Sequence, residues 1–134
     1  MFTRILVPLD GSALAESALG PATEIARKFD AEIILLHILE DAAIEAENAE
    51  FYISKVQQSL DRGGVKSRSL IVPAEADHSQ IVRAAASQNV SLIVMSTHGR
   101  TGRRTLEEGS VAVQVLSDIH IPVLFAKPSE YRQM

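Results

Sequence analysis

The sequence predicts an α/β fold in which one open parallel sheet of five strands carries helices on both faces. Short apolar runs alternate with segments of helical periodicity along the 134 residues, an order that is typical of parallel sheets. Hydrophobic residues make up 46% of the chain and aromatic residues only 4%, so the core must consist of Ile, Leu, Val and Ala. Right-handed crossovers leave few topologies, and the order 3-2-1-4-5 places the first and fourth strands side by side.

The first strand is predicted over Ile5–Leu9, a short apolar run that ends at Asp10–Ser12. Asp-Gly-Ser is typical of a turn that caps a helix, and the following segment has its apolar residues on one helical face up to Phe29. Gly20-Pro21 falls inside that segment. Because Pro21 supplies no N–H, we expect a single helix that is bent at this point.

The second strand is predicted over Ala31–Leu39, which is almost entirely apolar, as expected of a strand covered on both faces. From about Asp41 to Arg62 apolar residues recur at helical spacing, and Gly63-Gly64 follows, which predicts a helix that ends there. Lys66–Val72 alternates polar and apolar residues before Pro73. This pattern predicts an edge-like third strand.

A third helix can begin at Asp77 or Ser79 and end near Asn89. The last three elements are a strand, a helix and a strand, predicted over Val90–Met95, Ser110–Ser117 and Val123–Ala126. Pro122 stands at the start of the final strand, where a missing backbone donor costs least.

Charge and composition exclude several classes of protein. The net charge is −4 and no basic run is longer than Arg103-Arg104, so nucleic acid is not an expected partner. The absence of cysteine excludes a disulfide framework and thiol chemistry. The sequence has no signal-peptide pattern and no apolar stretch long enough to span a bilayer. We therefore expect one domain over residues 1–134, cytoplasmic and without a membrane partner.

A glycine-rich segment after the predicted fourth strand is the most informative part of the chain for function. Gly99, Gly102 and Gly109 lack Cβ atoms, so backbone N–H groups can approach a phosphate there. Ser110 opens a predicted helix, whose N-terminus favours an anion, and arginines beginning with Arg100 add positive charge. An ordinary strand-to-helix connection also uses glycine and serine, so the segment alone leaves both interpretations open.

Asp10 gives the glycine segment a predicted neighbour. It follows the first strand, and the glycine segment follows the fourth. Parallel sheets of this order bind ligands at the carboxyl ends of the strands that flank the switch point. Asp10 alone could be a helix cap or turn residue, but its convergence with the glycine segment favours a binding role.

The four histidines have no metal-ligand spacing. His37 lies in a predicted buried strand and is expected to be a core histidine with its hydrogen bonds satisfied. His98 is expected to be a hydrogen-bonding loop residue, because no Ser or Asp partner stands at a suggestive spacing. No residue is assigned a catalytic role.

Five segments, taken together, resemble the ATP-binding branch of the universal stress protein family, and the resemblance covers the whole chain. They are Ile5–Ser12, Leu35–Ile38, Ile93–Arg100, Gly109–Val111 and Pro122–Leu124. The resemblance implies a universal stress protein domain over residues 1–134 with a fold like that of the adenine nucleotide alpha hydrolases.

The resemblance also implies a nucleoside site built from strand ends. Pro8, Leu9 and Asp10 would border the adenine and ribose, with Asp10 as a carboxylate acceptor for a nucleoside N–H or hydroxyl. Ile38 and Met95 would line the base pocket.

The resemblance implies that the glycine segment binds the phosphates of ATP, together with Mg²⁺ or Mn²⁺. Ser96 and Gly99 would contact the ribose and first phosphates, and Gly109, Ser110 and Val111 the outer phosphates. The complete set of implied nucleotide-binding residues is Pro8, Leu9, Asp10, Ile38, Met95, Ser96, Gly99, Arg100, Gly109, Ser110 and Val111.

The chain departs from the family's pattern at two places. Ser96 stands where the first glycine of the nucleotide loop is usual, and Glu107-Glu108 stands where leucines are usual. The two glutamates would repel phosphates unless they point away, pair with Arg103 or Arg104, or face a metal ion.

The predicted function is that of an ATP-binding stress regulator whose nucleotide occupancy shifts a conformational or partner-binding equilibrium. Family homodimers pair their last strands antiparallel, which implies a homodimer through Val123–Ala126 and would hide an open sheet edge. Two alternatives stay open. One is slow ATP hydrolysis or phosphoryl transfer to Ser110 or Thr101, and the other is a dimeric scaffold that has lost its nucleotide site.

Overall fold

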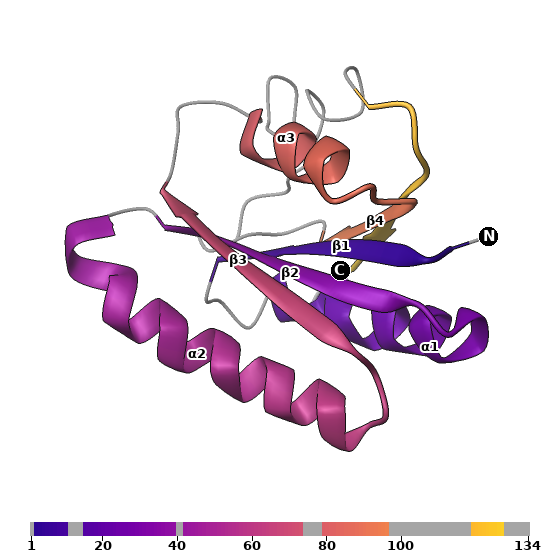
Figure 1. Ribbon diagram of the computed structural model, residues 1–134, viewed down its shortest axis with the longest axis horizontal. Coiled ribbons are helices and arrows are strands. Elements are labelled where there is room, and N and C mark those ends of the chain that lie inside the picture. The colour runs from indigo at the N-terminus through magenta and orange to yellow at the C-terminus, as the bar shows by residue number, and fades with distance from the viewer. Residues whose placement is uncertain (1, 11–14, 40–41, 74–78, 97–118, 128–134) are drawn as a thin grey trace.

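The computed structural model describes residues 2–10, 15–39, 42–73, 79–96 and 119–127. It confirms the predicted fold class, a sheet of five parallel strands in the order β3-β2-β1-β4-β5. Figure 1 shows helices on both sides of this sheet. The strands are β1 Arg4–Leu9, β2 Glu32–Leu39, β3 Ser67–Pro73, β4 Leu92–Ser96 and β5 Val123–Ala126. The helices are η1 Ala15–Ala18, α1 Leu19–Phe29, α2 Ala42–Arg62 and α3 Ser79–Ser87.

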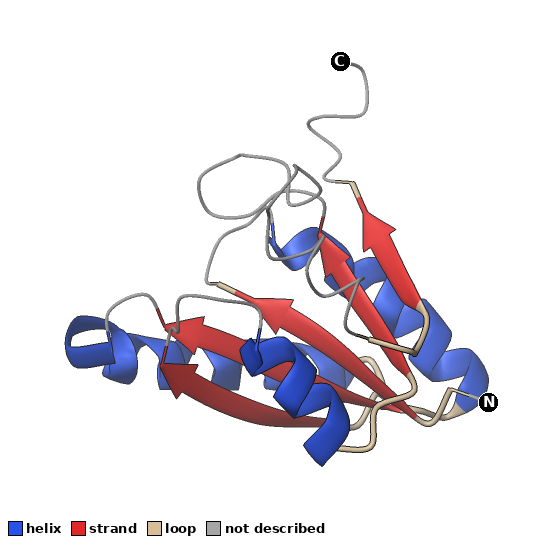
Figure 2. Cartoon of the chain, turned by 90° about the horizontal axis from the view of Figure 1, so that it is seen from above, coloured by secondary structure: helices blue, strands red, loops and turns tan. Residues whose placement is uncertain are grey.

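The switch point of the sheet lies between β1 and β4, as predicted. β1 pairs with β2 along its whole length, from Arg4↔Glu32 to Leu9↔His37. With β4 it pairs only at Ile5↔Leu92 and Leu6↔Ile93, near the amino ends of both strands. Figure 2 shows the five strands running in one direction and fanning apart toward their carboxyl ends.

Successive residues of the central strands pack alternately into two hydrophobic cores, one on each face of the sheet. Ile5 and Val7 of β1 pack with α1 and α2, while Leu6 between them packs with α3 on the opposite face. This is the alternation that a pleated strand imposes, and it explains why β1 is apolar at nearly every position. The prediction of helices on both faces is confirmed for α1, α2 and α3, whereas the predicted helix Ser110–Ser117 lies outside the described residues.

The first helical segment differs from the prediction of one bent helix. A 3-10 turn, η1, leads into α1, and Pro21 is the third residue of α1. Backbone N–H groups in the first turn of a helix have no intrahelical acceptor. A proline in this turn, which has no N–H, therefore breaks no helical hydrogen bond. The chain therefore changes helix type before Pro21 instead of bending at it.

The three described α-helices end in the same way. Each is followed within two residues by a residue of positive φ, and the next residue donates its N–H to the carbonyl five positions earlier, which is the Schellman motif. The residues with positive φ are Asp30, Gly64 and Asn89. The donor–acceptor pairs are Ala31–Ala26, Val65–Leu60 and Val90–Ala85. The fourth strand therefore begins at Leu92 and not at Val90, because Val90 completes the end of α3.

Candidate functional site

The carboxyl edge of the sheet at the switch point is the candidate site. Asp10 follows β1 directly and is half-buried, and Ser96 ends the neighbouring strand β4. The Ser17 hydroxyl of η1 donates a hydrogen bond to the Ser96 hydroxyl at 3.1 Å. Ser96 is only 6% exposed. The segment that follows β1 therefore packs against the end of β4, and the strand ends expected to meet do lie at one edge.

The other described site residues lie beside this edge with different exposures. Pro8 is half-buried in β1. Leu9 belongs to the core beneath α1 and α2, and Met95 to the core on the α3 face. Leu9 could therefore reach a nucleoside only through its backbone.

The remaining predicted site residues cannot be placed in the same way. Ile38 lies in β2, but its side chain is outside the description. Five predicted site residues are outside the described residues altogether, namely Gly99, Arg100, Gly109, Ser110 and Val111.

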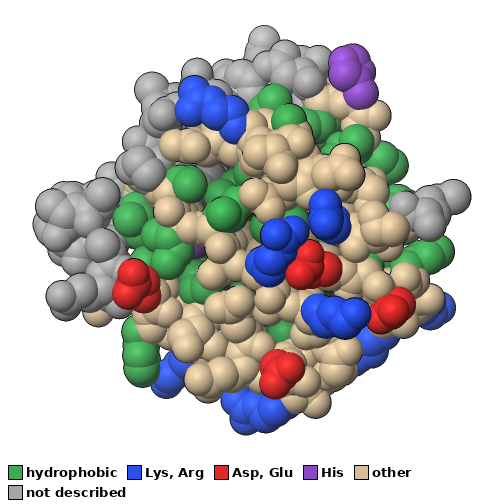
Figure 3. Space-filling model, in the orientation of Figure 1, with side chains coloured by type: hydrophobic (Ala, Val, Ile, Leu, Met, Phe, Trp, Pro, Cys, Tyr) green, Lys and Arg blue, Asp and Glu red, His purple; other side chains and the backbone are tan. Residues whose placement is uncertain are grey.

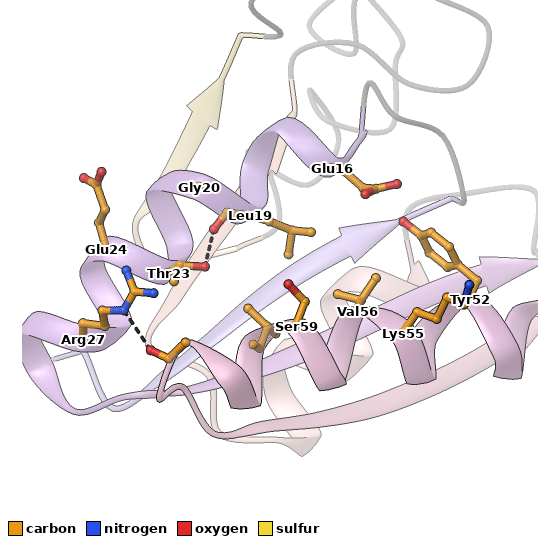
Figure 4. A pocket seen from close by; sticks show the side chains of 12 residues that line it. Glu16, Leu19, Gly20, Thr23, Glu24, Arg27, Tyr52, Lys55, Val56 and Ser59 are labelled. Atoms are coloured by element: carbon orange, nitrogen blue, oxygen red, sulfur yellow. Dashed lines mark hydrogen bonds between the residues drawn. The ribbon is translucent and has the colours of Figure 1, made fainter.

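A polar cluster of Asp10, Glu16, His37 and Tyr52 lies next to this edge. His37 is the β2 partner of Leu9, the residue before Asp10. His37 is 3% exposed, and its ring meets the Tyr52 ring edge-on, with centroids 5.4 Å apart and planes at 78°. Figure 4 shows the Tyr52 hydroxyl of α2 pointing toward Glu16 of η1. Residues distant in the sequence thus form one group.

Tyr52 is held as a neutral phenol in this cluster. Burial raises its pKa above the ordinary value most. The charge of Glu16, a hydrogen bond of the hydroxyl with the Glu16 side chain and, least, the charge of Asp10 raise the pKa further, because each of them disfavours the charged phenolate.

No sequence pattern indicated a role for Glu16 or Tyr52, whereas the apolar run around His37 correctly predicted that this residue is buried. Tyr52 shares the inward face of α2 with Ala49, Ile53 and Val56. The one sequence signal was that Tyr52, which carries a hydroxyl, stands among apolar residues on this helix face. That signal does not show that Glu16 and His37 are the residues next to Tyr52.

A groove of about 630 Å³ runs between α1 and α2. Leu19, Val56 and Leu60 supply its apolar lining. At one end Arg27 Nε donates to the Gly63 carbonyl at 3.0 Å, and Glu16 and Tyr52 line the other end (Figure 4). The groove thus leads toward the polar cluster.

One face of the described surface is mixed in character. Figure 3 shows basic and acidic side chains interspersed on one face, with no large area of a single sign. Among the residues placed by the structure, no group of three or more His, Cys, Asp and Glu side chains could hold a metal ion. No described helix is long and apolar enough to cross a membrane.

The strand order, the two helical layers and the polar edge at the switch point define a doubly wound α/β protein of the kind that binds ligands at its carboxyl edge. The model of the universal stress protein family matches residues 1–127. The chain belongs to that family, which confirms the resemblance noted in its sequence.

Similar proteins come from archaea and bacteria. The universal stress protein MJ0531 of Methanocaldococcus jannaschii is 32% identical, with 95% of this chain and 83% of the relative covered. The solved structure of the protein MJ0577 is 29% identical, with a TM-score of 0.83 and coverage of 96% and 98%; it comes from the same organism.

A universal stress protein from Archaeoglobus fulgidus, solved in complex with dAMP, shares the fold. Its TM-score is 0.71 at 22% identity, and 94% of this chain and 98% of that chain are covered.

Proposed function

We propose that this chain binds ATP at the carboxyl edge between β1 and β4 and acts as a nucleotide-responsive stress regulator. One observation carries the proposal. β1 and β4 are parallel neighbours on either side of the switch point, with Asp10 directly after the first strand and Ser96 at the end of the second. Asp10 and Ser96, the residue after which the glycine segment begins in the sequence, therefore lie at one edge of the sheet, where doubly wound proteins hold their ligands.

In this proposal the nucleoside and the phosphates have different partners. Asp10 accepts a hydrogen bond from a nucleoside N–H or hydroxyl. The backbone N–H groups near Gly99 and Gly109, with the Ser110 hydroxyl and Arg100, bind the phosphates. Mg²⁺ or Mn²⁺ enters on the phosphate oxygens rather than on a site made by protein side chains.

The Ser96 hydroxyl does not count against the proposal, although the family usually has glycine at this position. The hydroxyl is buried and bonded to Ser17, so it is directed to η1. A serine can therefore occupy this position while its polar atom is already satisfied within the protein.

The comparisons support an adenine nucleotide as the ligand class. The Archaeoglobus fulgidus protein of the same fold was solved with dAMP. That protein therefore accommodates an adenine nucleotide on the same fold.

Isothermal titration of the purified chain with MgATP tests the proposal. We expect saturable binding, weakened roughly 10-fold to 100-fold by Asp10→Ala, because a hydrogen bond to a charged group contributes about 1.5–3 kcal/mol. Glu24→Ala removes an exposed carboxylate of α1 and is the matched control, with unchanged affinity. Absence of saturable binding at millimolar nucleotide would contradict the proposal and favour the nucleotide-free scaffold.

The proposed regulator is a homodimer joined through β5. Among the described strands β5 has one neighbour, β4. Within the described part of the chain, its other edge therefore leaves backbone hydrogen-bonding groups that a second copy would pair. Leu124 of this strand is among the exposed large hydrophobic side chains. Burial of Leu124 against its counterpart would add apolar contact to the strand pairing.

A further inference from the structure

The strand β3 forms the edge of the sheet that lies opposite β5. Among the described strands β3 has one neighbour, β2. The Ile33 N–H of β2 donates to the Lys66 carbonyl at 2.9 Å, so Lys66 turns its backbone groups toward β2. Successive residues of a strand turn their backbone groups to opposite sides of the strand. Every second residue of β3 therefore directs its N–H and C=O away from β2, and these residues are Ser67, Ser69 and Ile71.

A groove of about 710 Å³ lies beside this edge, between β3 and α3. Leu36, Leu70, Val72 and Ala84 supply its apolar lining. Leu70 and Val72 are only half-buried and pack against the core on the α3 face. If another strand paired with β3, every second side chain of that strand would stand next to Leu70 and Val72. The edge therefore offers hydrogen bonds and apolar contact together.

The described side chains around this edge are basic. Residues 62–73 and 79–88 include four Arg or Lys side chains and no Asp or Glu, whereas the whole chain has a net charge of −4. The four are Arg62, Lys66, Arg68 and Arg83. Glu32 of β2 lies 3.0 Å from Arg68 and 3.8 Å from Arg4. Because this one carboxylate is shared by two guanidinium groups, it leaves positive charge at the edge.

The charge favours an acidic partner over a second copy of β3. Two copies paired edge to edge would bring their basic side chains together, and basic residues on edge strands are a common defence against such self-association. An acidic segment would be attracted to the same charges. The edge is also separate from β5, so the proposed dimer would leave it accessible.

We propose that the outer edge of β3 and the groove beside it bind an extended acidic segment of a partner protein, which adds to the sheet as an antiparallel strand. An antiparallel strand at the edge of a parallel sheet is a common arrangement, and strand addition is a known mode of peptide recognition. The inference goes beyond nucleotide binding and does not depend on it.

The pairing defines the chemistry of the bound segment. Residues opposite Ser69 and its outward-facing neighbours exchange backbone hydrogen bonds with β3, and the residues between them bring their side chains closest to β3. On the groove side, apolar side chains would therefore stand opposite Leu70 and Val72. A carboxylate would stand opposite Arg68.

A fluorescein-labelled peptide of the sequence Thr-Val-Thr-Val-Thr-Glu-Thr-Glu tests the proposal. In the antiparallel direction its valines stand opposite Val72 and Leu70, and its glutamates opposite Arg68 and Lys66. Fluorescence anisotropy should show saturable binding with a micromolar Kd. The matched peptide with lysine in place of both glutamates should bind at least about tenfold more weakly. Absence of saturable binding, or equal affinity for the two peptides, would overturn the proposal.

Ser69→Pro tests the backbone pairing. The Ser69 N–H points away from β2, so proline removes a donor from the outer edge and breaks no hydrogen bond of the sheet. We expect this variant to lower the peptide affinity at least about tenfold, whereas Ser69→Ala, which keeps the N–H, should stay within about twofold of the wild type. Circular dichroism checks that both variants are folded. A folded Ser69→Pro variant with wild-type affinity would overturn the proposal.

A charge exchange tests the same surface without changing the backbone, and it decides the matter if Ser69→Pro does not fold. Arg68→Glu should weaken binding of the glutamate peptide and strengthen binding of the lysine peptide, because the sign of the facing charge is reversed. A general loss of structure would lower both affinities. Unchanged preference for the glutamate peptide would overturn the proposal.

The free chain shows whether a second copy occupies the edge instead. Analytical ultracentrifugation without peptide should give the same association state for Ser69→Pro and Ser69→Ala. Loss of an oligomer in Ser69→Pro alone would overturn the proposal, because β3 would then pair with its counterpart in another copy.

Discussion

The end of α2 allows a stability prediction in which two adjacent glycines are replaced by alanine. Gly64 has φ +80°, and a Cβ added there would meet no atom within 4 Å. The cost of Gly64→Ala is therefore purely conformational. An L-residue in the left-handed region costs about 1–2 kcal/mol, and the reduced freedom of the unfolded chain returns about 0.4–1 kcal/mol, so we expect a net loss of roughly 1 kcal/mol.

Gly63→Ala is the matched control because its cost has a different origin. No positive φ restricts Gly63, but a Cβ there would lie 2.7 Å from Arg27 Nη2. The exposed guanidinium end of Arg27 can move aside, at the expense of its hydrogen bond to the Gly63 carbonyl, which contributes about 0.5–1.5 kcal/mol at most. We therefore expect Gly63→Ala to cost less than Gly64→Ala.

Urea denaturation followed by circular dichroism measures both variants against the wild type. The midpoint should fall more for Gly64→Ala than for Gly63→Ala, at an unchanged slope, because neither variant alters the surface exposed on unfolding. Equal stability of Gly64→Ala and the wild type would refute the conformational argument. A larger loss for Gly63→Ala would show that the crowding of Arg27 decides instead.

Three further predictions concern the polar cluster, the sheet edge and the end of β4. Above pH 10 the unfolded chain loses the Tyr52 phenol proton and the folded chain keeps it, so stability should fall with rising pH, and less steeply in Tyr52→Phe, as chemical denaturation would measure. In analytical ultracentrifugation, Leu124→Lys should weaken the proposed dimer by about tenfold or more, the equivalent of about 1.4 kcal/mol. Phe51→Lys, at a side chain 64% exposed on α2, should leave the association unchanged. Equal effects would contradict pairing through β5. Ser96→Ala should lower the free energy of unfolding by about 1 kcal/mol, because the hydrogen bond with Ser17 is lost. The same variant should keep its MgATP affinity within about twofold of the wild type. A large loss of affinity would indicate instead that the Ser96 hydroxyl contacts the ligand.

The fold could be predicted from sequence because its signals are local. Strands such as Ile5–Leu9 are short apolar runs between turn residues, and their alternation with helical segments determines the order of the sheet. Gly63-Gly64 also indicated the end of α2 correctly. The equivalent ends at Asp30 and Asn89 carry no glycine, so sequence alone did not predict that the three helices end alike.

The candidate site could be predicted only in part. Asp10 and Ser96 follow from the strand order, because the carboxyl ends of neighbouring parallel strands meet. The contact of His37 with Tyr52, and the approach of Glu16 to them, depend on how η1 and α2 pack over the sheet. That packing joins residues far apart in the chain, and no local pattern encodes it.

The repeated Schellman ends have a consequence for engineering. The residue that closes each helix is also a buried core residue one or two positions before the next strand, so the helix-to-strand connections contain no spare length. A peptide inserted there would disturb both the core and the strand register, and a tag or sensor peptide is better attached elsewhere. The edge of the sheet at the amino ends of the strands thus has tightly constrained connections. Sequence and length variation among relatives should concentrate at the carboxyl edge.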